Sequence, residues 1–215
     1  MAVVIRYLAH ASFQIAGGGK NIYVDLEKYS EPAQKADLIL VTHSHTDHCD
    51  PTKIEQVRTK DTIVVAPQDC VSKIGGTVRV LEPGDETTVD GIQVRAVDAY
   101  NVKRFRSPGK PYHPKDFGVG YLITLEGKTI YHAGDTDLIP EMRELGDIDV
   151  ALLPSGDTYT MDNAEAAEAA RIIHPQAVIP MHRWKTDPAE FRKKVESDSD
   201  IKVILLREGE EYRVA

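Results

Sequence analysis

Short segments that alternate apolar with polar residues, or that are wholly apolar, dominate the first half of the chain. Residues 3–9 (VVIRYLA) and 11–17 (ASFQIAG) alternate with the two-residue period of a strand that buries one face. Residues 36–43 (ADLILVTH) form the mainly apolar run of a buried strand. Further strands are predicted over residues 21–26, 62–67, 78–83, 86–90, 92–99, 147–154, 177–182, 201–206 and 210–214, with two more around a turn at Gly127 within residues 119–135.

Helix-start signals separate several of these strands. Asp50 followed by Pro51 is typical of a helix N-terminus, and Asp162 with Glu165 three residues later is typical of a capping box. Helices are predicted over residues 50–58, 68–76, 138–146, 162–174 and 187–197. Because strands dominate the first half and alternate with helices in the second, the pattern predicts a layered α/β protein with mixed sheets.

The composition is that of an ordinary soluble globular protein, with 41% hydrophobic and 28% charged residues in a chain of 215. A chain of this length buries roughly two-thirds of its unfolded surface, so it needs no metal merely to fold. No apolar stretch approaches the roughly 18 residues of a membrane span, and the first residues lack the pattern of a signal peptide. The only cysteines are Cys49 and Cys70, and together these features predict a cytoplasmic protein without membrane partners.

The net charge of −8 makes nucleic acid an unexpected partner, because phosphate binding depends on clustered basic residues. Residues 103–115 (KRFRSPGKPYHPK) depart from this acidic character and contain no acidic residue; the basic residues of this stretch are Lys103, Arg104, Arg106, Lys110 and Lys115. It lies within residues 100–117, a long three-proline segment of a kind that is often functional. The stretch is either a solvated loop or a rim that attracts an anionic substrate.

Residues 42–50 (THSHTDHCD) concentrate metal-binding groups directly after an apolar run. In an extended backbone His43, His45 and Asp47 point the same way, whereas His48 faces differently. Four donors this close are too many for one small tetrahedral ion, but two ions can share them. Imidazole and carboxylate ligands suit zinc, iron or manganese. The alternative, histidines in an ordinary polar loop, is disfavoured because three of the eight histidines fall within six positions.

Two further candidate ligands, Asp135 and His182, each follow an apolar run, where a strand end would hold a donor rigidly. A zinc finger would need cysteine pairs, and a zincin helix needs two histidines four residues apart with a glutamate between them. Neither pattern is present. The sequence therefore predicts a metal site that assembles from segments far apart in the chain.

These motifs resemble those of the metallo-β-lactamase fold superfamily. HSHTDH, GDTD and PMH occur in the family's order and over its length. Within the superfamily, YLAHASFQI, GVGYLI, IYHAGDTDLIPEM and LLPSGDTYTMDNAEAAEAA resemble uncharacterised metal-dependent hydrolases related to ascorbate-6-phosphate lactonase. The resemblance implies a single domain over residues 1–215, folded as a four-layer αββα sandwich of two mixed β-sheets flanked by helices.

The resemblance also implies two divalent metal ions, with zinc expected first and manganese or iron as alternatives. His43 and His45 would bind the first ion, Asp47, His48 and His182 the second, and Asp135 would bridge both. The family's middle histidine is missing, because Tyr100 and Asn101 stand at its place. His113 is the candidate replacement, and Asn101 or a water molecule is the alternative.

The remaining histidines and cysteines are less informative. His10 lies either beside the cleft or in a purely structural position. His132 is expected to point away from the metals, and His174, which precedes Pro175, to cap a helix. Cys49 adjoins a candidate ligand, but packing as a small buried side chain is the favoured interpretation.

The implied chemistry is hydrolysis by a metal-bridging hydroxide, with Asp47 orienting the nucleophile or moving its proton. The expected substrate is a small anionic ester or lactone, bound with the help of His10, Asn101, Lys103, Arg104 and Arg106. A phosphodiesterase acting on a small phosphodiester or nucleic acid is the alternative, followed by an iron-dependent redox enzyme of the same fold. A binding module without catalysis is a third class, and the sequence leaves a homo-oligomer open.

Overall fold

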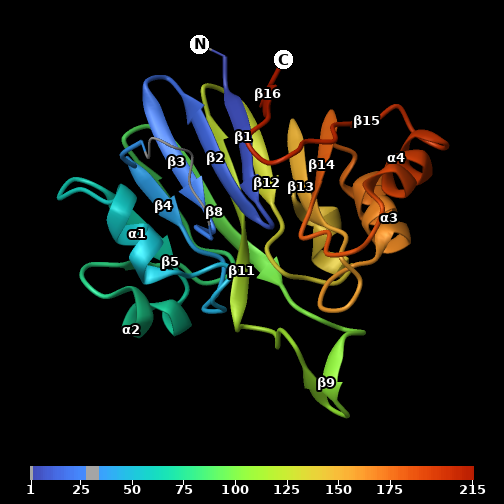
Figure 1. The fold of residues 1–215 in the computed structure, drawn as a ribbon, viewed down its shortest axis with the longest axis horizontal. Helices are drawn as coiled ribbons and strands as arrows, with labels where there is room; N and C mark the ends of the chain where they lie inside the picture. Colours follow the sequence, from blue (N-terminus) through green and yellow to red (C-terminus); the bar gives the residue numbers. More distant parts are fainter. Residues whose placement is uncertain (1, 28–33) are drawn as a thin grey trace.

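Two seven-stranded β-sheets form the centre of the molecule, with helices on both outer sides (Figure 1). The computed structural model describes residues 2–27 and 34–215. The helices α1 (Pro51–Val57) and α2 (Val71–Ile74) lie beside the first sheet, and α3 (Asn163–Ile173) and α4 (Pro188–Glu196) beside the second. This arrangement confirms the predicted αββα sandwich.

The first sheet has the strand order β16-β1-β2-β3-β4-β5-β6. Strands β1 to β3 and β16 pair antiparallel, whereas β3 to β6 pair parallel to one another. The strands are β1 (Val4–Ala9), β2 (Ser12–Gly17), β3 (Lys20–Val24), β4 (Leu38–Leu40), β5 (Ile63–Ala66), β6 (Arg79–Val80) and β16 (Glu211–Arg213).

The second sheet repeats this division, in the order β15-β14-β13-β12-β11-β8-β7. Strands β7, β8, β11 and β12 pair antiparallel, and β12 to β15 pair parallel. The strands are β7 (Glu86–Val89), β8 (Ile92–Ala99), β11 (Gly118–Leu125), β12 (Lys128–His132), β13 (Val150–Pro154), β14 (Ala177–Met181) and β15 (Lys202–Val203).

Apolar side chains from both sheets form the main core, in which Phe13, Ile15, Tyr121 and Ile123 are fully buried. A second cluster packs α1 and α2 onto the outside of the first sheet through residues such as Ile54. Burial of these surfaces stabilises the sandwich by about 25 cal/mol for each Å² removed from water. Among the described residues, no helix is both long and apolar enough to cross a membrane.

The predicted elements differ from the structure mainly where a predicted helix or edge strand is shorter in the structure than in the prediction. Residues 138–146 form only the 3-10 helix η2 (Pro140–Glu144), and residues 68–76 divide into the 3-10 helix η1 (Gln68–Cys70) and α2. Within 201–206 only β15 is regular, because this strand lies at a sheet edge with a single neighbour. Within 100–117 the chain forms a small hairpin of β9 (Phe105–Ser107) and β10 (Lys110–Pro111) that extends away from the sandwich (Figure 1).

Backbone hydrogen bonds join the two sheets at the edge where β4 and β14 end. The amide of His182 donates to the carbonyl of His10 over 2.8 Å, and the amide of Val119 donates to the carbonyl of Thr42 over 2.9 Å. The ends of strands from different sheets are thereby fixed next to one another. This edge carries the candidate ligands.

Candidate metal centre

Five segments meet at this edge of the sandwich. The loop after β4 holds His43, His45, Asp47 and His48, and the turn between β1 and β2 holds His10. Three other segments each supply one side chain: His113 precedes β11, Asp135 follows β12 and His182 follows β14. All of these side chains fall into groups whose nitrogen or carboxylate atoms lie within 4.8 Å of one another.

The first cluster consists of His43, His45 and His113. Nδ1 of His45 lies 3.1 Å from Nε2 of His43 and 3.3 Å from Nε2 of His113. Four ligands at the 2.0 to 2.1 Å typical of zinc–nitrogen bonds are separated by roughly 3.3 Å from one another. The spacing of the three nitrogens therefore fits one tetrahedral cation.

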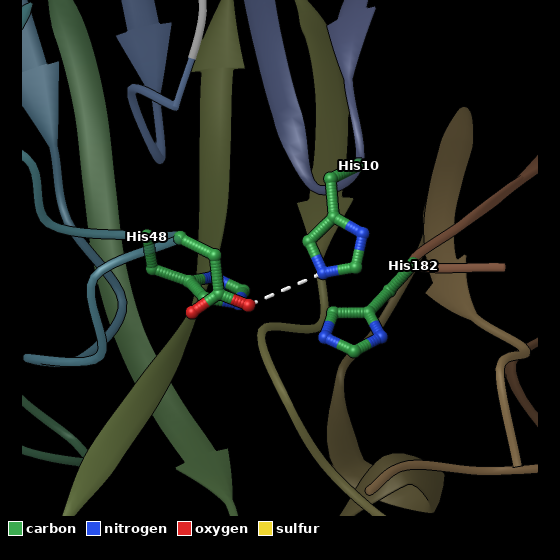
Figure 2. Close-up of side chains that lie close together, drawn as sticks. His10, His48 and His182 are labelled. Atoms are coloured by element: carbon green, nitrogen blue, oxygen red, sulfur yellow. Dashed lines mark ion pairs between the residues drawn. The ribbon is translucent and has the colours of Figure 1, made fainter. Parts of the chain in front are cut away.

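The second cluster consists of His10, Asp47, His48 and His182. Oδ2 of Asp47 lies 3.3 Å from Nε2 of His10 and 3.7 Å from Nε2 of His48. Figure 2 shows the rings of His10 and His182 next to each other, with the ion pair of His10 drawn as a dashed line, and the two ring centroids are 3.8 Å apart. The grouping of His48 with Asp47 and His182 agrees with the expectation, and His10 joins them.

Asp135 lies between the two clusters and contacts both. Its Oδ2 is 3.4 Å from Nε2 of His113 and 3.1 Å from Nε2 of His182, whereas Oδ1 is 3.4 Å from Nε2 of His48. The carboxyl group is buried. It is therefore the one described side chain placed to bridge two cations.

Asp25 orients the ligands from behind. Its Oδ2 is 2.7 Å from Nδ1 of His48 and accepts a 2.7 Å hydrogen bond from the hydroxyl of Thr42, whose oxygen lies 3.0 Å from Nδ1 of His43. A proton on Nδ1 of His48 leaves the lone pair of Nε2 facing Asp135. Such carboxylate–histidine contacts fix the tautomer of a metal ligand and increase its basicity.

Asn101 orients the ring of His113 through its Nδ1 atom, as Asp25 orients that of His48. Its Oδ1 accepts hydrogen bonds from the backbone amide of His113, over 2.8 Å, and from Nδ1 of the ring, over 2.9 Å. Its own amide group donates to the carbonyl of Tyr159. His113 thus reaches the cluster as expected, and Asn101 holds the ring from behind instead of entering the cluster itself.

Two glycines allow the segments to approach this closely. Gly134 has φ +63°, and a Cβ there would lie 2.7 Å from the carbonyl oxygen of Val119. A Cβ at Gly156 would lie 2.1 Å from the carbonyl oxygen of His182. A larger residue at Gly156 would displace the backbone of the candidate ligand His182, and one at Gly134 would push β11 away from the segment that carries Asp135.

Burial and charge set the protonation of the cluster. Burial lowers the pKa of His43 well below its ordinary value and lowers that of His113 to about 4, so both rings are neutral, the form that binds metals. Burial acts in the same direction on His48, but the charges of Asp135 and Asp25 outweigh it and raise its pKa to about 10. The negative charges of Asp135 and Asp25 therefore favour a positive charge at His48, and a divalent cation would supply that charge in place of a proton.

The donor set fits two divalent cations. It combines imidazole nitrogens with carboxylate oxygens, which suits zinc, manganese or iron. Nε2 of His48 and Oδ1 of Asp135 are buried and find no hydrogen-bond partner among the described residues, as atoms that serve as ligands would. That these residues hold metal stays a prediction.

Arg104 and Lys103 do not form the free cationic rim that was one of the two interpretations of the basic stretch. Arg104 forms ion pairs with Asp137 and Glu165, and its side chain is only 11% exposed. Lys103 also pairs with Glu165, at 2.6 Å. Because the carboxylates of Glu165 on α3 and of Asp137 already neutralise these two charges, the structure gives no support to a substrate role for either residue. Arg106 is exposed and forms no ion pair among residues 2–27 and 34–215.

The other histidines and Cys49 lie as expected. His132 is buried and points away from the clusters, with Nε2 2.9 Å from the carbonyl oxygen of Ala11. His174 caps the C-terminus of α3 in the left-handed conformation. Cys49 is fully buried with a free thiol.

Sequence reasoning missed Asp25 and Thr42 as supporting residues. Asp25 follows the apolar end of β3, the same pattern that identified Asp135 and His182. The signal was therefore present, but a single aspartate after a strand is common in turns. Thr42 offered no signal of its own beyond its place before His43.

Comparisons with known proteins agree with this geometry. Residues 4–182 match the model of the beta-lactamase superfamily domain. A relative from Thermococcus kodakarensis, named a metal-dependent hydrolase, is 37% identical over 232 residues, which cover 99% of this chain and 100% of the relative.

Two solved structures share the fold over nearly their whole length. A candidate metal-dependent hydrolase from Parabacteroides distasonis has a TM-score of 0.85 and 38% identity, covering 94% of this chain and 92% of its own. Igni18, a metallo hydrolase from Ignicoccus hospitalis, has a TM-score of 0.81 and 28% identity, covering 99% of this chain and 98% of its own.

Proposed function

The chain belongs to the beta-lactamase superfamily, and we propose that it is a metal-dependent hydrolase whose substrate is a small anionic ester or lactone. The relative from Thermococcus kodakarensis, similar over its full length, carries the name of a metal-dependent hydrolase. This supports the general class of activity. The substrate class and the use of two cations, zinc first, are our further proposals.

One observation carries the proposal, namely that two histidine clusters share the buried carboxylate of Asp135. His43, His45 and His113 would hold one cation, and Asp47, His48 and His182 the other. A pair of divalent cations, when bound, lowers the pKa of water and polarises the carbonyl oxygen of a substrate. Hydrolysis uses both effects at one place.

Asp47 is the residue best placed to move a proton. Burial would raise the pKa of its carboxyl group, but the hydrogen bond with His10 and the charge of His48 outweigh burial and keep the pKa below its ordinary value. Asp47 is thus ionised and able to orient water. As the water oxygen adds to the carbonyl carbon and the C–O bond of the ester breaks, the proton that water loses passes to the leaving oxygen.

The anionic character of the substrate is inferred from Arg106. It is an exposed member of the basic stretch whose guanidinium lies over the ring of Tyr112, the residue before His113, whereas the charges of Lys103 and Arg104 are neutralised by carboxylates. A carboxylate or phosphate on the substrate would meet this charge beside the first cluster.

The test is turnover by zinc-, manganese- and iron-loaded protein of three substrates: a phosphorylated lactone, an anionic carboxylic ester and bis(4-nitrophenyl) phosphate. We expect the lactone or ester to be hydrolysed, with kcat/KM falling by at least about 100-fold in Asp135→Asn. Asp149→Asn is the control, because Asp149 accepts a backbone hydrogen bond from Thr129 on the second sheet, outside both clusters. Turnover of the phosphodiester alone, or oxygen consumption with iron, would replace the proposal by the corresponding alternative.

A further inference from the structure

Aromatic side chains extend from the second cluster to the surface. The ring centroid of Trp184 lies 5.4 Å from that of His10 and 6.0 Å from that of His182, and Trp184 is 57% exposed. Tyr159 lies 5.7 Å from Trp184 and 4.7 Å from Tyr112, again between ring centroids. The three aromatic residues therefore form a continuous series beside the candidate ligands.

Arg106 ends this series at Tyr112, the residue before His113. Its guanidinium carbon lies 5.6 Å from the ring centroid of Tyr112, the distance of a cation–π contact. We call Trp184, Tyr159, Tyr112 and Arg106 the aromatic rim. The rim combines flat apolar faces with one cation that no described carboxylate neutralises.

The backbone conformation at Trp184 indicates that its side chain contributes little to the stability of the fold. Trp184 has φ +45°, and His182 two residues earlier has φ +47°. A non-glycine residue in this region is strained, and such strain is typical of functional sites. A large aromatic residue that is both strained and more than half exposed adds little to the core, and glycine would suit this backbone better.

We propose that the aromatic rim binds a flat, unsaturated group of the substrate against Trp184 and Tyr159, while Arg106 pairs with the anionic group. The inference rests on the proposed function, because the rim begins beside the candidate ligand His182 and beside His10, whose ring lies against that of His182. It narrows the substrate class to anionic esters or lactones that carry an aromatic or otherwise planar conjugated group.

Binding can be measured without turnover, because Trp184 is the only tryptophan of the chain. The probes are phenylphosphonate and methylphosphonate, which share the anion and differ in the ring, titrated against the emission of Trp184 with and without zinc. We expect phenylphosphonate to change the emission at about fivefold lower concentration than methylphosphonate, the factor typical of one aromatic contact. Equal affinities, or no change with either probe, would overturn the inference.

Variants test the same point by selectivity and stability. Trp184→Gly should lower the preference for a phenyl over a methyl ester of the same acid by about fivefold without lowering the melting temperature, and Trp184→Phe should restore the preference. Phe105→Ala is the control, since Phe105 is 44% exposed on the neighbouring hairpin. It should leave the preference unchanged.

The two proposals fail in different ways. If the wild type hydrolyses none of the substrates but still binds phenylphosphonate preferentially, the proposed function is wrong and the proposed role of the aromatic rim is supported. If the wild type hydrolyses the substrates and Trp184→Gly leaves the phenyl preference unchanged, the proposed function is supported and the inference about the aromatic rim is wrong. If Trp184→Gly instead converts a dimer into a monomer in sedimentation and leaves selectivity unaltered, Trp184 serves an interface between copies and the inference is wrong.

Discussion

At the scale of single residues, the candidate ligands depend on partners that contact the far side of their rings. Asp25 is fully buried and holds the Nδ1 side of His48, while Asn101 holds the Nδ1 side of His113. Each contact aims an Nε2 atom into the space beside Asp135. The clusters are therefore shaped as much by these two supporting residues as by the histidines themselves.

Asp25→Asn should weaken metal binding while the fold persists. An amide carries no negative charge to stabilise His48 as a ligand, and loss of such a supporting residue typically lowers affinity by about 10- to 100-fold. Zinc affinity measured by competition with a chromogenic chelator checks this. Asp149→Asn should retain wild-type affinity, and an unchanged affinity in Asp25→Asn would show that His48 needs no such support.

His132 should make stability depend on pH. Burial lowers its pKa below the ordinary value of 6.5, so the unfolded chain binds a proton more readily than the folded protein. Stability therefore falls as pH decreases below about 6.5, with a slope of at most about 1.4 kcal/mol per pH unit for one proton. Protonation would also cost the hydrogen bond that Nδ1 accepts from the amide of Gly134.

The measurement is urea unfolding of metal-free protein between pH 5 and 8. The wild type and His132→Gln contain the same other histidines. The difference between their slopes of unfolding free energy against pH therefore reports on His132 alone. We expect a shallower slope in the variant. Parallel curves for the two proteins would contradict the assignment of a buried neutral imidazole.

At the scale of elements, charged contacts fasten the segment 100–117 against the second sheet and α3. Oδ2 of Asp137 accepts hydrogen bonds from the backbone amides of residues 102–104, and the guanidinium of Arg104 lies between Asp137 and Glu165. These contacts define the path of the chain between Asn101 and His113. The basic stretch thus positions a candidate ligand, a role that its charge pattern did not reveal.

Arg104→Met should destabilise the metal-free protein by about 3 kcal/mol, because it leaves the fully buried carboxyl group of Asp137 without its cation. Lys103→Met is the matched comparison. The side chain of Lys103 is 62% exposed, so its loss should cost less than about 1 kcal/mol. Urea denaturation in the presence of a chelator measures both, and equal effects of the two substitutions would contradict the account of this segment.

At the scale of the whole molecule, we expect the large core to make folding independent of metal and the clusters to make stability respond to it. Zinc at 1,000 times its dissociation constant should add about 4 kcal/mol to the free energy of unfolding. Asp135→Asn should show a much smaller increment. Thermal unfolding with and without zinc checks both statements, and a metal-free protein that is unfolded would contradict the first.

Much of this architecture could be predicted from the sequence, because strand alternation, helix caps and the HSHTDH motif are local signals. The positions of Asp135 and His182 after apolar runs were local signals too. The neutralisation of Arg104 by Asp137 and Glu165, and the meeting of Trp184 with Tyr159 and Tyr112, depend on contacts between distant segments. No local pattern predicts such contacts, so the sequence indicated which candidate ligands gather at the clusters but not which side chains surround them.

The central claim is that the two histidine clusters, joined by Asp135, bind a pair of divalent cations. Anomalous diffraction from a zinc-loaded crystal tests it most directly. We predict two zinc peaks about 3.5 to 4 Å apart, each about 2.0 to 2.1 Å from its imidazole nitrogens, one at His43, His45 and His113 and the other at His48 and His182. Zinc bound elsewhere, or no zinc peak at either cluster, would contradict the account.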